Sequence, residues 1–386
     1  SGSDDETQGW IAENVTTLED GGIAVSWESY DGSATNERWD IYTRVFNADG
    51  TARSNELQVN TTSDNNQNYG SIGALEGTGA GYVVTWSDPN SADGSNWGIF
   101  AQRFAADGTA VGGEFQVNTY TYSTQIYSKV VGLSDGGFVI AWQSYGVDGN
   151  NYTISGQRYA ADGTAVDGEF IIPEATFSQD EFPSLALRND GALIAVWEAD
   201  NTRIEQKIIN DFSSDVRYIE DIEDDDLVST AGTSKDAPEV SELSGGGHIV
   251  VWSAYNQAPD SNSWGVFAQR YDDNGEKIGG EFLVNTTTSS TQYRPSVAGL
   301  DGGAQDGGFV VVWEAVNQTG DASGYGVVAQ LFAADGTKVG GEFLLNSTTS
   351  GNQLNPTVTA LDGGKFAATW TDNNNTVILR VFNADG

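Results

Sequence analysis

The residues best suited to contact a ligand follow a short recurring pattern, in which an aspartate precedes an aromatic residue by four positions. The pattern pairs Asp93 with Trp97, Asp148 with Tyr152, Asp260 with Trp264 and Asp321 with Tyr325, and Trp39 takes a similar place without the aspartate. Aromatic rings stack on the apolar patches of sugars, while carboxylates accept hydrogen bonds from hydroxyls. We therefore expect these nine residues to bind a ligand such as a glycan. In the alternative, each aspartate caps a turn and each ring packs.

A second candidate site is the acidic run YIEDIEDDDL, from Tyr218 to Leu227. Its residues Asp221, Asp224, Asp225 and Asp226 offer the oxygen ligands that Ca²⁺ prefers, so calcium is the one cofactor that we expect as a candidate. The spacing does not match the EF-hand loop. A solvated acidic loop is the alternative, because blocks of like charge repel one another and stay exposed.

Residues for nucleophilic or zinc catalysis are scarce. The chain has no cysteine, and its one histidine, His248, begins an apolar run. We expect this histidine on the face opposite the long loops, which argues against a Ser-His-Asp arrangement. A single histidine also excludes a histidine-rich zinc site. A pair of Asp or Glu residues could still hydrolyse glycosides, but the sequence does not show which carboxylates face each other.

These candidates are positioned by a repeat. Seven apolar runs end in a tryptophan, at Trp27, Trp86, Trp142, Trp197, Trp252, Trp313 and Trp370, with spacings of 55 to 61 residues. In the sixth repeat, residues 292–300, 309–315, 325–332 and 338–346 have the pattern of strands, and AADG supplies a hairpin turn before the last of them. Each repeat is therefore predicted to form a sheet of four antiparallel strands.

Such a sheet has two apolar faces, so it must stack against copies of itself. We predict an all-β fold, a seven-bladed β-propeller of four-stranded antiparallel blades that forms one domain over residues 1–386. The approximate blades are residues 8–60, 61–118, 119–173, 174–228, 229–285, 286–346 and 347–386. The tryptophans are expected to wedge between blades as packing residues.

The last blade is predicted to lack its outer strand, because the sequence stops at the NADG turn where a fourth strand should begin. Truncation is one explanation. The other is that the open edge accepts a strand from another chain, which would allow self-association.

Composition narrows the partners. The formal net charge of −38 disfavours nucleic acid and anionic membrane surfaces. No apolar stretch is long enough to insert into a membrane. The absence of cysteine and the abundance of Gly, Asn and Thr fit a secreted bacterial protein.

Three segments carry a resemblance: GGFVIAW (Gly136 to Trp142), WGIFAQRFAADGTAVGGEFQVN (Trp97 to Asn118) and WGVFAQRYDDNGEKIGGEFLVN (Trp264 to Asn285). They resemble repeats of very large secreted bacterial proteins of the RTX type, including adhesins and hemolysin-type calcium-binding proteins. The resemblance covers essentially the whole chain, although the glycine-rich calcium nonapeptides are missing. It implies an extracellular or cell-surface location, and it implies calcium dependence of the parent protein. A sialidase is a poor match, because the S-x-D-x-G-x-x-W box is absent.

The function predicted from these features is that of a non-catalytic binding or spacer module in an adhesin-like protein, and not of an enzyme. Its long-loop face would bind a glycan or a cell-surface protein with assistance from calcium. Two alternatives stay open. One is a polysaccharide-active enzyme with an Asp/Glu pair at the propeller mouth. The other is a structural subunit that polymerises by donating a strand to the seventh blade.

Overall fold

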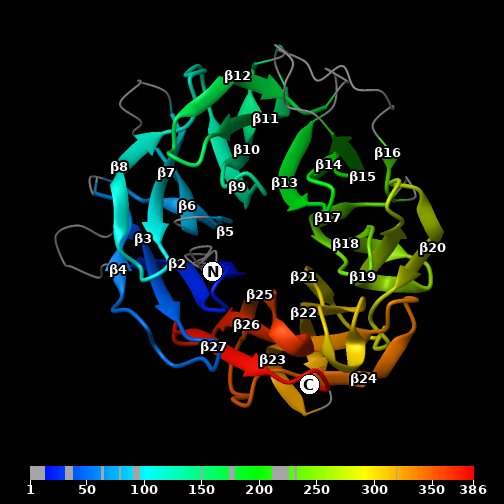
Figure 1. The fold of residues 1–386 in the computed structure, drawn as a ribbon. Coiled ribbons are helices and arrows are strands. Elements are labelled where there is room, and N and C mark those ends of the chain that lie inside the picture. The colour runs from blue at the N-terminus through cyan, green and yellow to red at the C-terminus, as the bar shows by residue number, and fades with distance from the viewer. Residues whose placement is uncertain are drawn as a thin grey trace, which may run out of the picture.

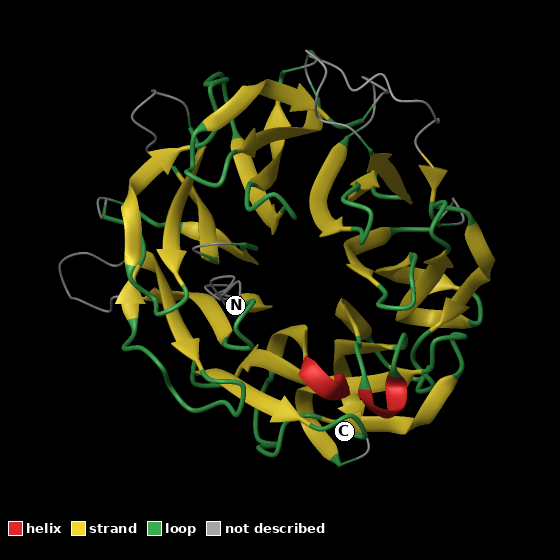
Figure 2. Cartoon of the chain, viewed as in Figure 1, coloured by secondary structure: helices red, strands yellow, loops and turns green. Residues whose placement is uncertain are grey.

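The computed structural model describes residues 14–30, 38–61, 65–77, 80–89, 96–147, 149, 151–173, 179–210, 226–229, 233–318 and 320–386. Its strands form seven sheets that stand side by side in a ring around a central axis (Figure 1). The predicted all-β, seven-bladed β-propeller is therefore confirmed. Strands dominate the regular structure, as Figure 2 shows.

The first four blades follow one another along the chain. Blade 1 contains β1 (Asn14–Thr17), β2 (Ile23–Tyr30), β3 (Trp39–Phe46) and β4 (Leu57–Gln58). Blade 2 contains β5 (Asn68–Ala74), β6 (Gly81–Asp88), β7 (Gly98–Ala105) and β8 (Ala110–Gln116). Blade 3 contains β9 (Gln125–Gly132), β10 (Phe138–Tyr145), β11 (Tyr152–Tyr159) and β12 (Ala165–Ile171). Blade 4 contains β13 (Asp180–Leu187), β14 (Leu193–Ala199), β15 (Arg203–Ile209) and the short β16 (Asp226–Leu227).

The remaining blades complete the ring. Blade 5 contains β17 (Lys235–Glu242), β18 (His248–Gln257), β19 (Asp260–Tyr271) and β20 (Lys277–Leu283). Blade 6 contains β21 (Gln292–Gly299), β22 (Phe309–Gln318), β23 (Asp321–Phe332) and β24 (Lys338–Leu344). Blade 7 contains β25 (Leu354–Leu361), β26 (Lys365–Thr371) and β27 (Val377–Phe382). Two 3₁₀ turns, η1 (Gly303–Gln305) and η2 (Asp362–Gly364), join first to second strands.

Every blade runs outward from the axis, with its first strand innermost (Figure 1). Because the strands are antiparallel, the turns that follow the first and third strands lie on one face, the short-turn face. The connections that follow the second and fourth strands lie on the other, the long-loop face. A turn such as residues 105–109 is tight because Gly108 has a φ of 88° and Asp107 accepts a hydrogen bond from the Thr109 amide.

Apolar side chains of the second and third strands join each blade to the next. Trp142 of blade 3, for example, lies in one buried cluster with Val83 and Ile99 of blade 2. Six motif tryptophans are at most 2% exposed: Trp86, Trp142, Trp197, Trp252, Trp313 and Trp370. Large aromatic side chains dominate the burial energy of a core, so the sheets are stable together and not singly.

Arginines on third strands connect neighbouring blades at the short-turn face. Arg103 donates hydrogen bonds of 2.6 and 2.5 Å to the carbonyl oxygens of Asp162 and Ala161, which belong to the hairpin turn of blade 3. Arg270 donates a bond of 2.7 Å to the carbonyl oxygen of Asp335 in blade 6. A planar guanidinium bridges two carbonyls of one turn, so the repeat fixes blade spacing here.

Blade 7 has three strands in the part of the chain that the structure describes, as predicted. Its outermost strand, β27, pairs only with β26 there. The junction between blades 7 and 1 is less well packed than the others, since Trp27 is only half-buried. Among the described residues, no helix has the length and hydropathy needed to cross a membrane.

Candidate functional site

A β-bulge in the first strands shapes the long-loop end of the central channel. In blade 6, Tyr293 pairs with Glu314 and Ser296 with Val312, so the inner strand holds one extra residue between these pairs. In six blades the bulge residue has a positive φ of 51° to 59°. These residues are Tyr69, Tyr127, Phe182, Ala237, Arg294 and Asn355. A bulge re-aims side chains, and all six residues line a single pocket.

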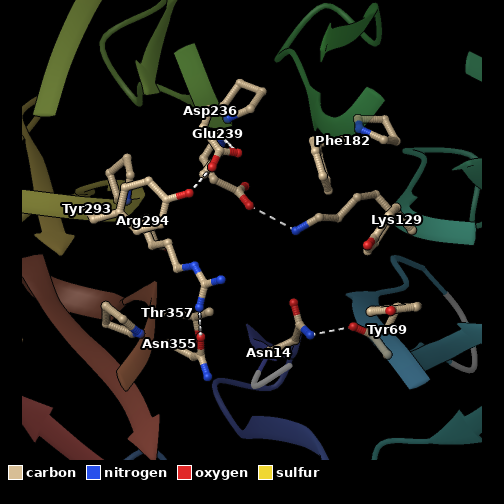
Figure 3. A pocket seen from close by; sticks show the side chains of 18 of the residues that line it. Asn14, Tyr69, Lys129, Phe182, Asp236, Glu239, Tyr293, Arg294, Asn355 and Thr357 are labelled. Carbon is tan, nitrogen blue, oxygen red and sulfur yellow. Dashed lines mark hydrogen bonds and ion pairs between the residues drawn. The ribbon is translucent and has the colours of Figure 1, made fainter. Parts of the chain in front are cut away.

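This pocket, which we call the mouth pocket, has a volume of about 360 Å³ and opens at the long-loop end of the channel (Figure 3). Its lining comes from the inner strands of all seven blades, from Asn14 in blade 1 to Thr357 in blade 7. A cavity of this size at the centre of a propeller suits a small ligand or a few units of a polymer.

One side of the mouth pocket is aromatic. The ring centroids of Tyr69 and Tyr127 lie 4.4 Å apart, and those of Tyr127 and Phe182 lie 4.8 Å apart. Trp97, at the start of the third strand of blade 2, lies 5.9 Å from Tyr69. We call Trp97, Tyr69, Tyr127 and Phe182 the aromatic arc. It runs without a gap across blades 2, 3 and 4.

The next blade around the ring, blade 5, carries two carboxylates from β17, Asp236 and Glu239, which we call the acid pair. They are three residues apart, yet they pair with Ser253 and Val251, which are two apart. The bulge at Ala237 therefore places both side chains on the channel side of the strand.

The two members of the acid pair have different surroundings. Burial raises the pKa of Asp236, while a hydrogen bond from the Ala237 amide and the charge of Arg294 oppose the rise. The hydroxyl of Tyr293 donates a hydrogen bond to Asp236 Oδ2. Glu239, by contrast, forms an ion pair of 2.9 Å with Lys129 across the channel (Figure 3). It also accepts a 2.8 Å hydrogen bond from Ser184. Burial thus favours the protonated form of Asp236 against the opposing effect of these donors, whereas the carboxylate of Glu239 has a cation and a hydroxyl as direct partners.

Arg294 is the other cation that lines the mouth pocket. Its Nη1 donates a hydrogen bond of 2.7 Å to Asn355 and lies 3.8 Å from the carboxylate of Glu314. Its guanidinium also lies over the ring of Tyr293, at 5.5 Å from the centroid. Both pocket cations, Lys129 and Arg294, are thus engaged by acceptors of the protein itself.

Beside the bulge, one hydrogen bond of the repeat is present at several junctions between blades. Among the described residues it is missing at two junctions, between blades 2 and 3, where the Ser87 hydroxyl has no partner, and between blades 4 and 5. The residue after the motif tryptophan accepts the bulge N–H of the next blade: Glu28 from Tyr69 at 2.5 Å, Ser253 from Arg294 at 3.0 Å and Glu314 from Asn355 at 2.7 Å. At the junction of blades 4 and 5 the Ala237 amide donates to Asp236 instead, at 2.7 Å.

The missing bond at the junction of blades 4 and 5 leaves Glu198 without its usual partner. Glu198 is 3% exposed, and its Oε2 has no hydrogen-bond partner among the described residues. It lies directly opposite Glu181 in the pairing of β13 with β14, so two like charges face each other across the strands. Burial, with the nearby Asp236 and Glu181, raises the pKa of Glu198 to about 8.

The aromatic residues predicted from the sequence lie at the long-loop face. Trp39, Trp97, Tyr152, Trp264 and Tyr325 are all half-buried at or beside the start of a third strand. Only Trp97 belongs to the aromatic arc. Trp264 approaches the mouth pocket through an edge contact of 5.0 Å with Tyr293.

The aspartates of the same pattern are placed differently. Asp93 and Asp148 lie outside the described residues. Asp260 and Asp321 are at most 1% exposed, so the expectation of surface ligands at these positions is corrected. Each accepts a hydrogen bond from a crossover asparagine, Asn285 at 2.9 Å and Asn346 at 2.8 Å. The aspartate fixes the strand-four-to-one connection, and this structural need explains its recurrence.

The predicted metal ligands fall mostly outside the described residues. Asp221, Asp224 and Asp225 are among those not described, while Asp226 opens β16 at the outer edge of blade 4 (Figure 1). Within the described part of the chain, no group of three His, Cys, Asp or Glu residues could hold a metal ion. A calcium site in the acidic run stays a prediction.

His248 lies where the sequence indicated, at the short-turn end of β18. It is fully buried, stacks on Tyr271 at 4.4 Å and contacts Gln206 at 2.9 Å. Burial lowers its pKa to about 3, so the ring stays neutral and its role is structural.

Most residues of the mouth pocket were missed in the sequence, including the acid pair and three members of the aromatic arc. The sequence does contain one feature that marks the pocket positions. Four of the seven prolines, Pro183, Pro238, Pro295 and Pro356, directly follow a bulge residue. Their even spacing marks the position where each inner strand turns its side chain to the mouth.

No family model and no curated protein matches the chain. Solved structures share its fold. An α-L-arabinanase from Penicillium chrysogenum, complexed with arabinobiose, has 12% sequence identity and a TM-score of 0.54, over 97% of this chain and 93% of that one. The NanB sialidase from Streptococcus pneumoniae has 11% identity and a TM-score of 0.51, over 98% and 68%. The α-L-arabinofuranosidase Arb93A from Fusarium graminearum has 13% identity and a TM-score of 0.50, over 97% and 92%.

At these identities the similarity shows the fold alone. The prediction that the chain is not an enzyme is nevertheless corrected. It rested on the scarcity of histidine and cysteine, and the enzymes above show that a propeller of this kind can be catalytic. The arabinanase, the sialidase and the arabinofuranosidase all share this fold. The mouth pocket also holds two carboxylates, Asp236 and Glu239, that the sequence did not reveal.

Proposed function

We propose that this protein is a carbohydrate-active enzyme that hydrolyses glycosidic bonds of a polysaccharide in the mouth pocket. The observation that carries the proposal is the arrangement of that pocket, in which the aromatic arc of blades 2 to 4 adjoins the acid pair of blade 5. Aromatic faces hold sugar rings, and two carboxylates are what glycoside hydrolysis needs. The similarity to arabinan-cleaving and sialidase propellers supports this choice of chemistry.

In this reaction one residue of the acid pair acts as a proton donor, and the other acts as a base or a nucleophile. Asp236, whose pKa is raised by burial, donates its proton to the oxygen of the leaving sugar as the bond from that oxygen to the anomeric carbon breaks. Glu239, which forms an ion pair with Lys129, either takes a proton from an attacking water or attacks the anomeric carbon itself. The configuration of the product distinguishes these two routes.

Polysaccharides are too large to cross a cell membrane, so the proposal places the protein outside the cell. This agrees with the extracellular location that the RTX-type resemblance implies. A glycan is then the partner of the long-loop face.

Turnover of a polysaccharide panel tests the proposal. The purified chain is incubated with arabinan, xylan, galactan and mixed glucans, and new reducing ends are counted. We expect at least one polymer to be cleaved, and Asp236→Asn or Glu239→Gln to lower the rate by about 100-fold or more. Asp335→Asn, in a hairpin turn on the short-turn face, is the control and should retain activity. Absence of turnover across the panel, or full activity of both acid-pair variants, would refute the proposal.

A further inference from the structure

We infer that the aromatic arc is a binding track for a chain of uncharged sugar units, which extends from the acid pair across blades 4, 3 and 2. The inference rests on the proposed function. It adds the class of substrate, a neutral polymer, and the direction in which that polymer lies. It also assigns Tyr69, Tyr127 and Phe182 to substrate binding.

The fold does not require aromatic residues at these positions. The same bulge position holds Ala237 in blade 5, Arg294 in blade 6 and Asn355 in blade 7, with the same positive φ. Bulky side chains are unfavourable at positive φ, where Asn and Gly are preferred. Three adjacent blades nevertheless carry Tyr, Tyr and Phe there, and strained residues of this kind concentrate at ligand sites.

The spacing of the rings suits a polymer. Neighbouring centroids along the arc are 4.4 to 5.9 Å apart, which is comparable to the length of one sugar unit. All four rings are half-buried, so each keeps part of its surface toward solvent. Tyr69, Tyr127 and Phe182 also line the mouth pocket itself, and the track is therefore continuous with the acid pair.

The charges around the track select against acidic sugars. The arc contains no charged side chain, and both pocket cations already have partners. Lys129 pairs with Glu239. Arg294 contacts Asn355 and Glu314. Among the described residues that line the pocket, no uncommitted cation would receive a uronate or sialate carboxylate that approaches the acid pair. The net charge of −38 repels polyanions at longer range.

The test measures binding separately from turnover. Neutral oligosaccharides from disaccharide to hexasaccharide, of the polymer type that is cleaved or otherwise of each type in the panel, are titrated calorimetrically into Asp236→Asn, which does not consume them. Tyr127→Asn and Phe182→Asn are then added to this background. Asn is chosen because blade 7 already has it at the equivalent position. Tyr122→Ala is the matched control, since Tyr122 is 70% exposed on the same face but lies outside the arc.

We expect affinity to rise with chain length, and each arc variant to weaken hexasaccharide binding by about five- to tenfold while disaccharide binding changes less. Tyr122→Ala should bind as the background does, and polygalacturonate should not bind. Equal affinities for the disaccharide and the hexasaccharide, undiminished binding by both arc variants, or preference for polygalacturonate would overturn the inference. Arc-dependent binding without any turnover would refute the proposed function and leave the track standing. Unchanged polymer turnover when Tyr127→Asn and Phe182→Asn are made in the wild-type chain would refute the track and leave the proposed function standing.

Discussion

Replacing Glu198 by Gln should make the protein more stable at alkaline pH. Glu198 is 3% exposed, faces Glu181 across the β13–β14 pair and lies near Asp236. No hydrogen bond reaches its Oε2 from the described residues. The folded protein therefore favours the protonated form of this carboxyl, whereas the unfolded chain does not. Glutamine has nearly the same shape and carries no charge.

The direction and size of the change in stability with pH follow from the pKa of Glu198, which rises from 4.5 to about 8 on folding. Below pH 4.5 both states bind the proton, so the group has no effect on stability. Between the two values the unfolded chain releases its proton and the folded chain keeps it, so stability falls by about 1.36 kcal/mol per pH unit. The penalty reaches at most about 5 kcal/mol above pH 8. It is smaller where Glu181 or Asp236 releases or takes a proton in place of Glu198.

Thermal unfolding between pH 5 and pH 9 measures this effect. The wild-type melting temperature should fall across the range, and the fall should be reduced in Glu198→Gln. Asp49→Asn is the control, because hydrogen bonds from Thr51 lower the pKa of Asp49 and its titration lies below this window. Parallel melting curves for the wild type and Glu198→Gln would show that Glu198 is ionised in the fold, and the account of the blade 4–5 junction would be wrong.

Three further perturbations test other parts of the structure. Trp86→Ala should lower the free energy of unfolding by about 3–5 kcal/mol, and Trp27→Ala by clearly less, because only Trp86 is fully buried; equal losses in denaturant unfolding would contradict the loose junction of blades 7 and 1. Asp321→Ala should lower the free energy of unfolding by about 1–3 kcal/mol, because the Asn346 side-chain amide loses its carboxylate partner. Oligosaccharide affinity, measured by calorimetry, should stay unchanged, and weakened sugar binding would show that Asp321 is a ligand after all. Calcium should raise the melting temperature relative to EDTA, and replacing the aspartates of the acidic run by asparagine should abolish the rise; identical melting with and without calcium would remove that predicted site.

The propeller could be predicted because it depends on features that every repeat shares. The motif tryptophans, the AADG turns and the apolar second strands each recur with the period of the blade. A recurring side chain answers a recurring need of the fold, such as packing between blades or closing a hairpin. Counting the tryptophans therefore gave the number of blades, and the turn at the end of the sequence indicated the three-stranded seventh blade.

Recurrence along the chain does not mark the residues of the mouth pocket. Asp260 and Asp321 recur because the fold needs a buried carboxylate to hold the crossover asparagine. The acid pair does not recur at all: the positions of Asp236 and Glu239 hold Tyr293 and Ser296 in blade 6. These carboxylates also become neighbours of the aromatic arc only through the packing of successive blades around the axis, which no local sequence pattern expresses.

A ligand at the axis of a propeller contacts every blade at once, so a site with seven identical sides could not orient an asymmetric sugar. Orientation requires the blades to differ at the mouth, and they differ at the bulge, where the backbone is constant and the side chain is free. Aromatic residues fill this position in blades 2 to 4, and Ala, Arg and Asn fill it in blades 5 to 7. The junction of blades 4 and 5 also breaks the rule by which the residue after the tryptophan caps the next bulge. In a repeat protein the fold is read from what recurs, and the site is found where one repeat departs from the others.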